Sequence, residues 1–98
     1  MTDDALSPAT EEHDLSFDEL CVRYAVQPEW IIELVEHGAL EPAGASAGEW
    51  RFAEVSLMRV AKARRLSTDL EINPPGIAMV FDLLEEIDRL RAQLRRST

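Results

Sequence analysis

Two short amphipathic segments, at about residues 17–24 and 28–37, are separated by only three residues, of which Val26 and Gln27 make the turn. Each carries apolar side chains at spacings of three and four residues, which places those side chains on one face of a helix. Two short helices that each have one apolar face and share a tight turn are typical of a helix-turn-helix. This pattern constrains the fold more than any other feature of the chain.

Local signals mark the ends of both helices. Ser16 and Glu19 have the spacing of a capping box, in which side chain and backbone exchange hydrogen bonds at a helix start. Pro28 suits the first position of the second helix, and Gly38 suits the position just after its end. The expected inward-facing residues are Phe17, Leu20, Cys21 and Tyr24 in the first helix and Ile31, Leu34 and Val35 in the second.

The remaining segments predict a wing and two further helices. Leu40 on one side, and Trp50 with Phe52 on the other, are expected to form a β-hairpin whose tip is the small-residue stretch 43–48. A third helix is expected at about 53–69, with Val55, Met58 and Leu66 at helical spacing. The break Asn73-Pro74-Pro75-Gly76 separates it from a last helix at about 75–96. The predicted fold is mainly α, a winged helix-turn-helix with a small β-hairpin wing and a long C-terminal helix. It comprises one domain at 15–98 after a flexible acidic tail at 1–14.

The last helix carries a row of apolar residues that steps by three and four positions, as in a coiled-coil seam. The row spans only two heptads, which leaves two interpretations open. The helix packs on its own domain, or it pairs with a second copy of the chain in a homodimer. The residues of this seam are Val80, Leu83, Ile87, Leu90 and Leu94.

Charge argues against nucleic acid as the partner. The chain has a formal net charge of −9, and the predicted second helix contains no Lys or Arg that could contact phosphates or bases. Instead Glu29, Glu33 and Glu36 share one face of that helix. We interpret this row as an acidic docking face for a basic partner helix, with Trp30 as the anchor. The alternative is an ordinary solvated helix face, with Trp30 covering the edge of the core.

The sequence shows no sign of catalysis or of a cofactor. Cys21 lies on the inward stripe of the first helix, and His13 and His37 have no partner at metal-ligand spacing. We therefore expect no enzyme activity, metal or small-molecule substrate. The sequence also has no apolar run long enough to span a membrane and no secretory signal, so we expect a cytoplasmic protein that binds no membrane.

The residues also resemble a known family. The order of two short helices, Glu36-His37-Gly38-Ala39-Leu40 and an aromatic wing is similar to the MerR superfamily. Across residues 15–96 the chain more closely resembles the CbpM family of bacterial chaperone modulators. The residues that carry this resemblance are Glu19-Leu20-Cys21, Glu33-Leu34-Val35-Glu36, Trp50-x-Phe52, Asp69-Leu70-x-Ile72-Asn73, Gly76-Ile77-Ala78 and the segment from Asp82 to Arg91.

The resemblance implies a function that the residues alone do not give. Members of this family bind the J domain of the co-chaperone CbpA and suppress its activity toward Hsp70. The resemblance further implies that the second helix of the J domain is basic and is the surface that Hsp70 also contacts. We interpret the acidic face as a docking site for that helix. Two alternatives stay open at this point. One is a MerR-like transcriptional regulator that binds DNA, and the other is an adaptor for an unspecified basic protein.

Overall fold

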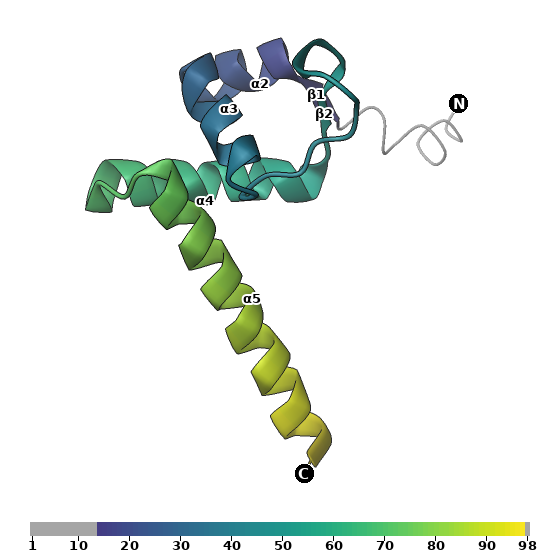
Figure 1. The fold of residues 1–98 in the computed structure, drawn as a ribbon, viewed down its shortest axis with the longest axis vertical. Helices are drawn as coiled ribbons and strands as arrows, with labels where there is room; N and C mark the ends of the chain where they lie inside the picture. Colours follow the sequence, from purple (N-terminus) through teal and green to yellow (C-terminus); the bar gives the residue numbers. More distant parts are fainter. Residues whose placement is uncertain (1–13, 98) are drawn as a thin grey trace, which may run out of the picture.

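The structure is a computed structural model that describes residues 14–97, and it is mainly helical (Figure 1). A two-stranded antiparallel sheet joins the start of the described chain to the segment before the third helix. The elements in order are β1 (Leu15–Ser16), α2 (Phe17–Tyr24), α3 (Pro28–Glu36), the 3₁₀ turn η2 (Ala47–Glu49), β2 (Arg51–Phe52), α4 (Glu54–Leu70) and α5 (Pro74–Ser97). Apart from Asp14, the predicted tail lies outside the described residues.

The predicted helix-turn-helix is confirmed as α2 and α3. The Glu19 backbone N–H donates to the Ser16 hydroxyl at 3.1 Å, and the Ser16 N–H donates to the Glu19 carboxylate at 2.9 Å. These two bonds form the expected capping box. Pro28 opens α3, and Gly38 follows it with φ +83°, a conformation that favours glycine. The helix ends agree with the sequence because each depends on neighbours within four residues.

The wing has a different strand pairing from the prediction. Its hairpin is reduced to one bridge between Ala43 and Arg51, and the regular pairing joins β2 to β1 instead. Leu40, expected in the hairpin, lies in the core. The Arg51 guanidinium donates to the Asp14 carbonyl at 3.1 Å and thereby stabilises the contact between β2 and the start of β1. The regular partner strand of β2 is therefore β1, and the short segment after Leu40 contributes only the single bridge at Ala43.

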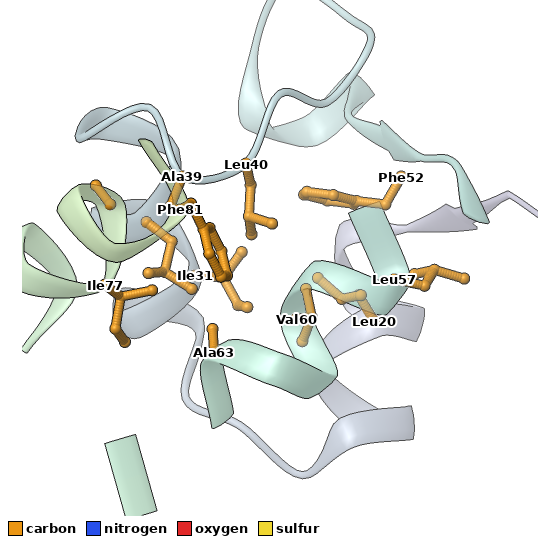
Figure 2. Packing of buried hydrophobic residues seen from close by; sticks show 12 residues of the cluster. Leu20, Ile31, Ala39, Leu40, Phe52, Leu57, Val60, Ala63, Ile77 and Phe81 are labelled. Carbon is orange, nitrogen blue, oxygen red and sulfur yellow. The ribbon is translucent and has the colours of Figure 1, made fainter. Parts of the chain in front are cut away.

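Side chains from all four helices and the connecting segments meet in one hydrophobic core (Figure 2). The expected inward stripe of α4 is wrong in part. Val55 and Met58 are 65% and 68% exposed, and the buried apolar side chains of α4 are Leu57, Val60 and Ala63. Both the predicted and the observed set of apolar residues have helical spacing. The buried set is the one that faces the core residues of the other elements. Those residues are Leu20, Ile31, Leu34, Ala39, Leu40, Phe52, Ile77, Ala78 and Phe81.

A sharp turn separates α4 from α5. Its first residue, Glu71, has a left-handed conformation with φ 56°. Asn73 directly precedes α5, and its side-chain oxygen accepts from the Gly76 backbone N–H at 2.9 Å. Because Pro74 and Pro75 have no N–H, this bond satisfies the first free donor of the helix.

The beginning of α5 is buried, and the rest projects from the body (Figure 1). Ile77, Ala78 and Phe81 pack in the core. Arg59 of α4 reaches this part of α5. Its guanidinium lies 5.1 Å from the centroid of the Phe81 ring, forms an ion pair with Glu85, and donates to the Ala39 carbonyl at 2.9 Å. Arg59 thereby connects α4, α5 and the segment after α3 at the base of the projecting helix.

Candidate functional site

The predicted acidic face lies on the solvent side of α3. Ile31 and Leu34 are fully buried, which fixes the rotation of the helix. Glu29, Glu33 and Glu36 are consequently exposed on the other side, one helical turn apart. The structure thus brings the three carboxylates into one row, as their spacing predicted.

This row does not stabilise the helix that carries it. Glu33 and Glu36 lie in the last turn of α3, where the helix dipole favours a cation, and that turn contains none. Like charges three or four residues apart cost a helix about 0.2–0.5 kcal/mol each. Within residues 14–97, none of the three carboxylates forms an ion pair. The fold itself therefore leaves this charge uncompensated.

Trp30 differs from the three glutamates in its environment. It is half-buried and packs against the core cluster, so part of the indole belongs to the body of the protein. The remainder is accessible beside the acidic row. Trp30 therefore covers the core edge, and an anchoring role for its exposed part stays a prediction.

A second acidic feature, which the sequence pattern did not indicate, lies near the C-terminal end of α3. A hollow of about 310 Å³ is lined by Gly38, Glu41, Arg59 and the α5 residues Asp82 and Glu85. Arg59 pairs with Glu85, whereas no ion pair is formed by Glu41 or Asp82 in the described part of the chain. The hollow begins two residues after Glu36 and adds acidic side chains near that end of the row. No local signal could have found it, because its residues come from three separate segments.

The elements that read DNA in a helix-turn-helix lack the side chains most often used for it. Arg, Lys, Asn and Gln make the commonest bidentate contacts to bases, and Arg and Lys neutralise phosphates. α3 contains none of these four residue types, and residues 43–50 of the wing also contain none. Arg51, the nearest base, already donates to the Asp14 carbonyl. A phosphate backbone that approaches these two surfaces would therefore meet carboxylates and no compensating cation.

The seam residues lie on α5 with different exposures. Val80 is half-buried and packs against the core. Beyond it, Leu83, Ile87, Leu90 and Leu94 are 57%, 43%, 44% and 67% exposed. The projecting part of α5 therefore does not bury its apolar row on its own domain.

The remaining reactive groups do not form a site. Cys21 is half-buried, and burial, together with the nearby Asp18 and Glu29 carboxylates, raises the pKa of its thiol, which disfavours the nucleophilic thiolate. Over residues 14–97, no three His, Cys, Asp or Glu side chains are grouped as metal ligands. Among the helices described, none combines the length and apolar character needed to cross a bilayer.

Comparison with known proteins gives consistent results. Residues 15–97 match the family described as MerR HTH family regulatory protein. The chain is 46% identical over 81 residues to chaperone modulatory protein CbpM of Coxiella burnetii strain Dugway 5J108-111, covering 83% of this chain and 76% of that protein. It is 38% identical to CbpM of Pseudomonas entomophila strain L48 and 32% identical to CbpM of Pseudomonas putida strain W619. Each of these matches covers 74 residues, 76% of this chain and 73% of the relative. These relatives are named as modulators of a chaperone.

Proposed function

Since the chain belongs to the CbpM family of chaperone modulatory proteins, with a MerR-type helix-turn-helix, we propose that it inhibits a CbpA-type co-chaperone by binding its J domain. Binding would mask the surface that Hsp70 uses. The inhibitor would act by occupancy alone, without chemistry of its own.

The observation that carries the proposal is the uncompensated carboxylate row on α3. The row, with Trp30 beside it and the acidic hollow near its end, presents negative charge from a rigid helix anchored by Ile31 and Leu34. A basic helix laid along α3 would supply the positive charge that the last turn lacks. Charge complementarity of this kind raises the association rate and selects the partner.

The experiment is titration calorimetry of the full chain against the purified J domain of the CbpA-type protein from the same organism. We expect saturable binding by the wild type and loss of binding in the variant Glu29→Lys with Glu33→Lys and Glu36→Lys. Duplex DNA serves as the parallel ligand. Binding to DNA and not to the J domain would favour the alternative function, a MerR-like transcriptional regulator.

A matched control separates the site from the overall charge. The variant Glu49→Lys with Glu71→Lys and Asp88→Lys makes the same change in net charge at exposed positions on other elements. We expect it to keep most of the affinity, because surface charges beyond about 10 Å are largely screened at 0.1 M salt. Equal losses in both triple variants would remove α3 as the docking face.

A second proposal concerns assembly. We infer that the exposed row Leu83, Ile87, Leu90 and Leu94 pairs with the same row of a second copy, giving a homodimer along α5. A projecting helix with a contiguous apolar face exposes surface that soluble monomers normally cover. In sedimentation velocity the wild type is expected to be dimeric, and Leu83→Asp with Leu90→Asp is expected to be monomeric. A wild type that sediments as a monomer at micromolar concentration contradicts this assembly.

A further inference from the structure

A groove runs along the exposed face of α4 and is separate from the acidic row. It has a volume of about 770 Å³, and Tyr24 at the end of α2 forms part of its wall. Val55, Met58 and Ala61 are its apolar lining residues on α4. The side chains of Val55 and Met58, whose exposure corrected the predicted core, therefore contribute to this hollowed surface.

Most of the charged residues that line this groove are basic, although the chain as a whole is strongly acidic. Arg59, Lys62, Arg64 and Arg65 line it, against the single carboxylate of Asp69. Arg59 is engaged with Glu85, but Lys62, Arg64 and Arg65 form no ion pair with any residue from 14 to 97. Apolar residues interleaved with unpaired cations fit an acidic segment that also carries apolar side chains.

The groove leads toward the point where the described chain begins. A smaller hollow of about 370 Å³ shares Tyr24, Met58 and Ala61 with the groove, and Leu15 lines it as well. Leu15 is the second described residue. The segment that precedes it in the sequence is therefore attached beside one end of the groove.

We propose that residues 1–13 of the same chain bind in this groove. The segment contains Asp3, Asp4, Glu11 and Glu12 and no Lys or Arg, so its charge complements the cations of the groove. Its apolar side chains, with Leu6 the largest besides Met1, match the apolar residues that line the groove. This contact is independent of the partner that α3 binds.

The length of the segment suffices for this contact. Thirteen residues span up to about 45 Å when extended, whereas the 17 residues of α4 span about 25 Å. Attachment at Leu15 also keeps the segment at a high effective concentration near the groove, so even weak ion pairs are populated. The consequence is that the basic strip is neutralised internally, and the molecule presents mainly its acidic surface to a partner.

Paramagnetic relaxation in the full chain tests the proposal. A nitroxide is attached at Ala9→Cys in a Cys21→Ala background, and amide intensities are compared with those of the reduced label. We expect the amides of Val55, Met58 and Lys62 to lose most of their intensity. The effect should disappear when Asp3, Asp4, Glu11 and Glu12 are replaced by Asn and Gln, and when Lys62→Glu is combined with Arg65→Glu.

The control variant is Arg91→Glu with Arg96→Glu, which changes the net charge equally on α5 and should preserve the broadening. Broadening confined to residues near Leu15 overturns the proposal. Broadening of α4 that survives Lys62→Glu with Arg65→Glu overturns the electrostatic basis of the contact. A second sample mixes spin-labelled protein without ¹⁵N and ¹⁵N protein without a spin label, so that any broadening in it arises from contacts between copies. If this broadening equals that of protein carrying both the spin label and ¹⁵N, the tail of another copy binds, and the intramolecular arrangement is overturned.

Discussion

Arg59 holds the base of the projecting helix, and replacing it with methionine tests how α5 is attached to the body. Methionine keeps the apolar contacts of the side-chain stem and removes the guanidinium. The change removes the hydrogen bond to the Ala39 carbonyl, the contact over Phe81 and the ion pair with Glu85. Because Ala39 is fully buried, its carbonyl loses its partner where water has little access.

The magnitude follows from these three contacts. A hydrogen bond from a charged donor contributes about 1.5–3 kcal/mol, and a cation over an aromatic ring at an exposed site about 0.5–1 kcal/mol. The ion pair adds between about 0 and 1 kcal/mol, since the Glu85 side chain is 61% exposed. We therefore expect Arg59→Met to lower the free energy of unfolding by about 2–5 kcal/mol. The corresponding fall in Tm is at least about 8 °C.

The assay is urea unfolding followed by circular dichroism at a fixed protomer concentration, because dimerisation would shift the midpoint by mass action. Glu85→Gln removes only the ion pair and should cost at most about 1 kcal/mol. Arg91→Met, at an exposed cation on α5, should stay within about 0.5 kcal/mol of the wild type. If Arg59→Met costs no more than Glu85→Gln, the buried carbonyl does not depend on Arg59, and the reasoning is wrong.

Two further predictions concern helix starts. A Cβ at Gly76 would lie 2.7 Å from the Cγ2 of Ile72, so Gly76→Ala should lower stability by about 1 kcal/mol in thermal unfolding, because overpacking outweighs the gain in helix propensity. Gly48→Ala meets no atom within 4 Å and should be nearly neutral; equal effects would contradict the clash. The hydrogen bond from the Ser16 backbone N–H lowers the pKa of Glu19 in the folded state, so its contribution is present above the ordinary value of 4.5 and is lost as pH falls through the lowered value. The stability difference between wild type and Glu19→Gln should therefore shrink in urea titrations below pH 4.5, and a constant difference would refute the role of the ionised cap.

The candidate site was predictable where it depends on one helix. A spacing of four and three residues placed Glu29, Glu33 and Glu36 on one face, and the structure keeps them there because Ile31 and Leu34 turn the opposite face inward. The acidic hollow was not predictable in the same way. Its acidic residues come from the segment after α3 and from α5, and only packing of α5 against α3 and α4 brings these segments together.

The ends of the helices follow from local signals in the sequence. The capping box at Ser16, Pro28 at the start of α3, Gly38 after it and Asn73 before α5 all act through backbone geometry and hydrogen bonds within four residues. Such interactions need no distant partner, so these helices would begin and end at the same residues in any fold that contains them.

Which helix faces and which strands meet depends instead on tertiary packing. Val55 and Met58 fit a helical stripe as well as Leu57 and Val60 do, and the choice depends on where Leu20 and the rest of the core lie. The pairing of β1 with β2 likewise joins residues that are 35 and 37 positions apart in the sequence. Burial free energy is non-directional and depends on the surface that is covered, so a periodic pattern offers candidate faces and the packed neighbours select among them.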